Sequence, residues 1–126
     1  MMKKLISSGS SFEKKLGYSR AVIVGNWAFV SGVTGYNYKT MIMPNDIFSQ
    51  ATNCFETIQK SLIEGGFSLS DTVRVQYTLT SSKLVDDAAP VLEKYMGNIR
   101  PAATMVIANM IKPEMLIEIE ITALKN

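Results

Sequence analysis

Hydrophobic and polar residues alternate along two segments of the chain, which is the pattern of strands buried on one face. In residues 70–80 the apolar positions are Val73, Val75, Tyr77 and Leu79, and the polar ones are Arg74, Gln76, Thr78 and Thr80. Residues 116–124 alternate in the same way. Their apolar positions are Ile117, Ile119 and Ile121, and their polar ones are Glu118, Glu120 and Thr122. Both segments are therefore predicted as strands with one polar face.

Other short apolar segments complete the predicted sheet. Residues 20–32 predict a hairpin, since two apolar runs flank Gly25-Asn26, a pair suited to a tight turn. "KKLIS" near the N-terminus predicts a short first strand, and residues 104–110 predict another near the C-terminus. Residues 7–19 are predicted as a turn-rich loop.

Two segments carry apolar residues at helical spacing. Asp46 is a suitable N-cap for the first, and Gly65-Gly66 is a suitable end. Its apolar stripe comprises Ile47, Ala51, Cys54, Phe55, Ile58 and Leu62. The second helix is predicted over residues 86–97, with Ala88, Val91, Leu92 and Tyr95 toward the core. Its Pro90 is compatible with a helix only in the first turn.

The predicted order is β-β-β-α-β-α-β-β, an α+β fold with a mixed six-stranded sheet packed on two helices. Residues 1–126 are expected to form a single domain. Two helices can cover only one face of the sheet. The other face carries Glu118, Glu120 and Arg74 and is expected to be solvated or buried against other subunits.

Composition excludes several kinds of chemistry. The chain has no histidine and one cysteine, which removes His-based catalysis, zinc sites and an internal disulfide. No cofactor is indicated. The formal net charge of +2 gives no reason to expect nucleic acid as a partner. The start "MMKKLISS" has too few apolar residues for a signal peptide, and no apolar run could span a membrane, so a cytoplasmic protein is expected.

Three segments resemble one protein family. "GYSRAVIVGNWAFVSGVTG", "PAATMV" and "IEIEITALK" are similar to the Rid superfamily, the reactive intermediate (imine/enamine) deaminases also known as endoribonuclease L-PSP-like or YjgF-like proteins. The resemblance covers nearly the whole chain. It implies a chorismate-mutase-like subunit and a homotrimer whose sheets form a central barrel. It further implies small-molecule clefts between neighbouring subunits.

The resemblance also implies site residues. Tyr18, Ser31 and Gly32 match ligand-binding positions, and Glu118 matches the glutamate that positions the hydrolytic water. Backbone amides near Gly32 and Thr104 would polarise a carbonyl or imine. The arginine with which the active deaminases bind a substrate carboxylate falls on Ala103 in this chain. The usual 2-imino acids are therefore poor candidate substrates.

Arg100 lies three residues before Ala103, and two interpretations of it stay open. It could bind an anion in the cleft from a displaced position, or pair on the surface with Glu93 or Asp87. Arg20 and Arg74 are expected to serve subunit pairing, with Arg74 a partner for Glu118 and Glu120 if these only line the barrel. Cys54, on the first helical stripe, is expected to be a packing residue.

Two functions remain open at the level of the sequence. The first is a small-molecule deaminase or hydrolase that acts on C–N or C=N bonds, with Glu118 orienting water. The second is a non-catalytic metabolite-binding or interaction trimer that kept the cleft. A ribonuclease rests on the older family name alone and is the least favoured.

Overall fold

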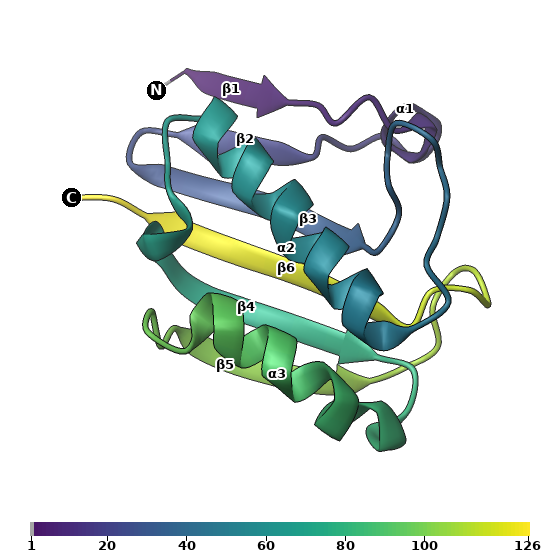
Figure 1. Cartoon of the computed structure of the whole chain (residues 1–126). Coiled ribbons are helices and arrows are strands. Elements are labelled where there is room, and N and C mark those ends of the chain that lie inside the picture. Colours follow the sequence, from purple (N-terminus) through teal and green to yellow (C-terminus); the bar gives the residue numbers. More distant parts are fainter. Residues whose placement is uncertain (1) are drawn as a thin grey trace.

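A computed structural model describes residues 2–126. One six-stranded mixed sheet carries two long helices on a single face, as Figure 1 shows. The strands are β1 (Lys3–Ile6), β2 (Ala21–Val24), β3 (Trp27–Thr34), β4 (Thr72–Leu79), β5 (Ala102–Ile107) and β6 (Ile117–Leu124). Their order in the sheet is β1-β2-β3-β6-β4-β5. Among the strands of residues 2–126, only β4 and β5 pair in parallel.

The predicted hairpin is confirmed. Val24 pairs with Trp27 across a two-residue turn in which Gly25 has a φ of 57°. Such a left-handed backbone suits a glycine in a hairpin turn. The first strand is confirmed too, as β1. The strand predicted over 104–110 begins two residues earlier and ends three earlier, because the chain leaves the sheet after Ile107.

Helix α2 (Ile47–Glu64) confirms the first predicted helix in detail. The Asp46 carboxylate accepts a hydrogen bond from the Ser49 backbone N–H, as an N-cap should. Every residue of the predicted apolar stripe is at most 5% exposed. This stripe packs on the sheet and forms the centre of the hydrophobic core.

Helix α3 (Val85–Met96) begins earlier than expected, directly after a 3-10 turn, η2 (Ser82–Leu84). Pro90 is consequently the sixth residue of the helix and lies beyond its first turn. It faces solvent, and Asp86 four residues before it is exposed as well, so water can hydrate the carbonyl that loses its donor. The prediction for Pro90 was wrong by about half a turn.

Three further local predictions were wrong. Val73 was expected in the core but is 41% exposed, because the pairing of β4 with β6 shifts between Thr72 and Arg74 and turns Val73 outward. Ser70 and Asp71 lie in the 3-10 turn η1 (Leu69–Asp71) rather than in the strand. Part of the expected loop 7–19 is a short helix, α1 (Ser11–Leu16), whose N-cap is Ser10.

The face of the sheet opposite the helices has an exposed apolar portion. Trp27 and Phe29 stack there with their ring centroids 6.0 Å apart, and both are more than 40% exposed. At the edge of the sheet, all six residues of β5 are exposed. An exposed edge strand together with exposed aromatic side chains on the open face is unusual for a monomer.

Candidate functional site

Glu118 lies on the open face of the sheet, between two strands. In β6 it pairs with Thr34 of β3 on one side and with Thr78 of β4 on the other. Its carboxylate lies against the backbone of Gly32. A Cβ at that position would come within 2.6 Å of the Glu118 Cδ and 2.9 Å of each carboxylate oxygen. The absence of a side chain at Gly32 therefore makes the space that the carboxylate occupies.

An irregularity in β3 creates this arrangement. The pairing of β3 with β6 shifts between Val30 and Val33, which leaves Ser31 and Gly32 outside the regular ladder. A bulge of this kind bends a strand and is common next to functional sites. Two of the predicted ligand-binding residues therefore lie in the bulge beside Glu118.

The environment of Glu118 changes its acidity. Burial raises the pKa of this carboxyl, and the neighbouring Glu120 raises it further, whereas the charge of Arg20 acts in the opposite direction. The net direction is upward. A partly buried carboxyl with a raised pKa is a suitable general base. Neither Glu118 nor Glu120 forms an ion pair with Arg74 among residues 2–126, so that expected pairing is absent in the single chain.

Ser31 and Tyr18 surround the same place. The Ser31 hydroxyl donates a hydrogen bond to the Ser19 carbonyl at 2.6 Å, so its proton is already engaged while its oxygen can still accept one from a ligand. Tyr18 is half-buried, and its ring centroid lies 5.7 Å from the guanidinium carbon of Arg20. The structure thus brings Tyr18, Ser31, Gly32 and Glu118 together.

Arg20 is the member of this cluster that sequence reasoning missed. It was expected to serve subunit pairing, yet it is 0% exposed within its own subunit. Its Nη1 donates to the Gly32 carbonyl at 2.9 Å, and its Nε lies 3.9 Å from the Glu13 carboxylate. The ring of Tyr38 lies 5.1 Å from its guanidinium carbon. A single charged residue at the start of an apolar strand was the only signal of this role.

The other predicted residues lie at the far edge of the sheet. Arg100, Ala103 and Thr104 belong to β5 or to the turn before it, and strands β6 and β4 separate β5 from β3. With neighbouring strands about 4.8 Å apart, three steps place these residues roughly 14 Å from Gly32. One chain therefore holds the predicted residues in two separate groups.

Arg100 and Ala103 line a cavity of about 800 Å³ between α3 and β5. Val75, Tyr77, Met96 and Pro101 are among its other lining residues. Burial raises the pKa of Tyr77 to about 12, so this phenol stays protonated at physiological pH. Thr104 pairs with Gln76 in the adjoining strand.

The backbone of Arg100 is left-handed, with a φ of 58°. This conformation is uncommon for residues other than glycine and asparagine and is worth an explanation where it occurs. The side chain is exposed and forms no ion pair with Glu93, Asp87 or any other described residue. The surface pairing considered for Arg100 is thus absent in the single chain.

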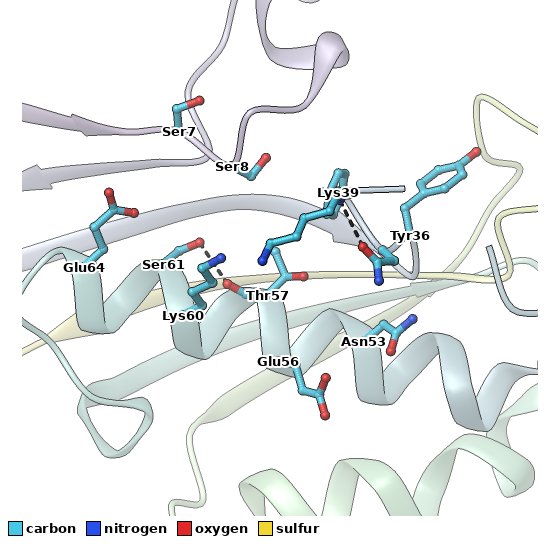
Figure 2. A pocket seen from close by; sticks show the side chains of 12 residues that line it. Ser7, Ser8, Tyr36, Lys39, Asn53, Glu56, Thr57, Lys60, Ser61 and Glu64 are labelled. Atoms are coloured by element: carbon cyan, nitrogen blue, oxygen red, sulfur yellow. Dashed lines mark hydrogen bonds between the residues drawn. The ribbon is translucent and has the colours of Figure 1, made fainter. Parts of the chain in front are cut away.

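A second cavity, of about 350 Å³, lies beside α2, next to the segment that follows β1. Figure 2 shows it between Ser7 and Ser8 on one side and a row of α2 side chains on the other. It contains lysines and glutamates, namely Lys39, Lys60, Glu56 and Glu64. None of the predicted site residues lines this cavity.

Residues 2–126 contain no group of three or more Cys, Asp or Glu side chains placed to hold a metal ion. No helix in this part of the chain has the length and apolar character needed to cross a membrane.

Comparisons with known proteins identify the family. The family model described as Endoribonuclease L-PSP matches residues 9–125. A RutC family protein from Pyrococcus horikoshii is 32% identical over 126 residues, covering 98% of this chain and 99% of the relative. The chain belongs to this Endoribonuclease L-PSP family, which is the Rid/YjgF superfamily expected from the sequence.

Solved structures agree with this membership. Rv2704 of Mycobacterium tuberculosis, a member of the YjgF/YER057c/UK114 family, superposes with a TM-score of 0.90 at 34% identity, covering 98% of this chain and 100% of the other. RidA from the Antarctic bacterium Psychrobacter superposes with a TM-score of 0.82 at 26% identity, covering 97% and 94%. The fold predicted from the sequence is therefore confirmed.

Proposed function

We propose that this protein is a homotrimer whose clefts between subunits bind a small molecule, and that Glu118 activates water there to hydrolyse a C=N bond. The observation that carries the proposal is the separation of the predicted residues into two groups at opposite parts of one sheet. The proposed ligand site needs both groups, and the group of Tyr18, Ser31 and Glu118 forms only half of it. A neighbouring subunit is the simplest source of the missing half.

The exposed surfaces support an assembly of this kind. The stacked Trp27 and Phe29 lie on the open face, and β5 offers a fully exposed edge. Burying both would remove apolar side chains from water at about 25 cal/mol per Å². In the proposed trimer the β5 edge of one subunit lies beside the bulged end of β3 of its neighbour.

The chemistry follows from the position of Glu118. Its carboxylate takes a proton from water as the water oxygen bonds to the imine carbon, and it passes this proton to the imine nitrogen. In the resulting carbinolamine the carboxylate moves the hydroxyl proton to the nitrogen in the same way. The C–N bond then breaks, which releases ammonia and leaves a carbonyl product. Backbone amides near Gly32 and Thr104 would stabilise the charge that develops on the way. No metal or cofactor is required by these steps.

The substrate is proposed to differ from the 2-imino acids of the active deaminases. Ala103 cannot bind a carboxylate. Without an arginine at this position, about 2–5 kcal/mol of substrate binding free energy is lost unless another residue supplies it. Arg100 lines the same cavity and is unpaired among residues 2–126. We infer that Arg100 binds the anionic group of the ligand from this displaced position.

Ammonia release tests the proposal. Imines generated in situ, 2-aminoacrylate and iminoleucine, are compared with imines that carry the anionic group farther from the C=N carbon. The proposal is supported if the imines with the more distant anionic group are hydrolysed and the rate falls by a factor of about 10²–10⁴ in Glu118→Ala protein. Glu120→Ala, two residues away on the same face of the same strand, is the matched control.

A binding protein without catalysis is the second candidate, and the alanine at position 103 favours it. Saturable binding of a metabolite with no turnover above the rate in buffer would establish that function and overturn the hydrolase. Sedimentation at the mass of a monomer would overturn the shared cleft in either case.

A further inference from the structure

The guanidinium of Arg20 is fully buried and poorly satisfied. Its Nη1 bonds the Gly32 carbonyl at 2.9 Å, with the Ser31 carbonyl at 3.5 Å. Its Nε and Nη2 make no hydrogen bond with residues 2–126. Buried polar groups without partners are rare in folded proteins, and a buried cation is costlier still. The arginine therefore calls for an explanation.

A purely structural role does not explain the charge. Replacing a buried ion pair by apolar side chains of similar volume is often neutral or stabilising. Here the opposing carboxylate of Glu13 lies 3.9 Å away, beyond hydrogen-bond range, and is itself bonded by the backbone and hydroxyl of Ser8. With this geometry the pair is a weak source of stability, and the Arg20 charge is free to act on another group.

The charge acts on Glu118. The titratable groups coupled by charge to Glu118 are Glu120 on its own strand, Arg20 just before β2 and, across the sheet, the Cys54 thiol on α2. Its partners in β3 and β4 are the uncharged Thr34 and Thr78. Burial raises the pKa of Cys54, so this thiol stays neutral. Arg20 is accordingly the only cation among these groups that stabilises the Glu118 carboxylate.

We propose that Arg20 is the positioning residue of Glu118. Through Nη1 it fixes the bulge at Ser31 and Gly32 over which the carboxylate lies, and its charge keeps that carboxylate ionised and available as a base. The rings of Tyr18 and Tyr38 flank the guanidinium and keep water from screening it. This inference rests on the proposed role of Glu118.

Carboxyl-carbon NMR of the full-length protein tests the electrostatic part without any substrate. The pKa of Glu118 should rise in Arg20→Gln and return toward the wild-type value in Arg20→Lys, which keeps the charge. Arg74→Gln, which removes an exposed arginine from the same sheet, is the matched control and should leave the pKa of Glu118 unchanged. An unchanged Glu118 pKa in folded Arg20→Gln protein would overturn the proposal.

A second measurement leaves Arg20 in place and decides the question if Arg20→Gln does not fold. The side-chain nitrogen resonances of Arg20 should shift with pH at the midpoint of Glu118, and this transition should vanish in Glu118→Gln. The proposal would be overturned if the Arg20 resonances shifted only with the titration of Glu13 and were unchanged in Glu118→Gln.

Kinetics separate this inference from the proposed function. If ammonia is released, the acid limb of the kcat/KM profile should move to higher pH in Arg20→Gln and back in Arg20→Lys, a rescue that a merely structural role would not give. If ammonia release is absent while the Glu118 pKa still depends on Arg20, the hydrolase fails and the electrostatic coupling stands. If turnover depends on Glu118 but the Glu118 pKa does not change in Arg20→Gln, the hydrolase stands and the electrostatic coupling fails.

Discussion

The carboxylate of Glu118 lies so close to the backbone of Gly32 that a single methyl group there would come within 2.6 Å of the Glu118 Cδ. The contact joins the bulge of β3 to the central strand β6. A substitution at position 32 can therefore test where the Glu118 carboxylate must lie. The added methyl group would clash with the end of the Glu118 side chain, which can move.

Gly32→Ala should displace Glu118 while the fold is kept. The expected loss of stability is about 1–3 kcal/mol, typical of overpacking, and the loss of any Glu118-dependent turnover should approach that of Glu118→Ala. Urea unfolding and ammonia release measure the two effects. In a Glu118→Ala background the clash is gone, so Gly32→Ala should then cost clearly less. Equal costs in both backgrounds would show that the methyl group strains the backbone instead.

The raised pKa of Glu118 makes a prediction about stability against pH. A carboxyl whose pKa is higher in the folded state binds its proton more tightly there, so its contribution to stability is complete below the unfolded pKa. That contribution is lost as pH rises through the folded pKa. Glu118→Gln should therefore be more stable than wild type at pH 7, with the difference shrinking toward pH 4.

Urea unfolding at a series of pH values measures this difference. Glu120→Gln is the companion variant: because the Glu120 charge raises the pKa of Glu118, its removal should reduce the stability gained by Glu118→Gln at pH 7. A wild-type protein that is more stable than Glu118→Gln at pH 7 would contradict the assignment of Glu118 as a desolvated carboxylate.

Much of this fold was predictable because its patterns are local. The stripe of α2 repeats at helical spacing from Ile47 to Leu62, and the alternation in β6 needs only one buried face. Helix α1 was missed although a signal was present: Ser10 followed three residues later by Glu13 is the capping-box pattern. Val73 was misplaced because its strand shifts register, which depends on pairing with a distant strand.

The site was predictable only in part, for a physical reason. Tyr18, Ser31, Gly32 and Glu118 came from the resemblance, and the bulge explains why Ser31 and Gly32 lie near Glu118. The role of Arg20 depends on burial by Tyr18, Tyr38 and Glu13, which converge from separate segments. Alternation along one strand cannot reveal such a convergence.

The proposed trimer predicts that a charge on the β5 edge or the open face disrupts assembly. Val106→Lys and Phe29→Glu, each at a partly exposed apolar residue, should weaken association by about 3–5 kcal/mol because each would bury an uncompensated charge. Ile63→Lys on the outer side of α2 is the control and should assemble normally. Analytical ultracentrifugation gives the mass. Unchanged sedimentation of both variants would place the interface elsewhere.

Position 103 allows the missing arginine to be restored. Ala103 is exposed and lines the cavity that Arg100 shares, so a longer side chain can enter without a clash. If the proposed cleft is correct, Ala103→Arg should improve kcat/KM for 2-imino acids by an amount that corresponds to about 2–5 kcal/mol of carboxylate binding. Ala103→Gln, of similar length but neutral, should not. Equal effects of the two variants would exclude a charge-dependent gain.

The same experiment separates the roles of Arg100 and position 103. Arg100→Asn keeps a residue that tolerates a left-handed backbone, so it removes the charge with little change of conformation. It should weaken the binding of the wild-type ligand, and adding Ala103→Arg should restore binding of carboxylates attached directly to the C=N carbon. The reason is distance. In the proposed cleft Arg100, three residues before position 103, binds the anionic group farther from the imine carbon that the water attacks. Arg100→Asn protein that binds its ligand as tightly as wild type would show that Arg100 is a surface residue.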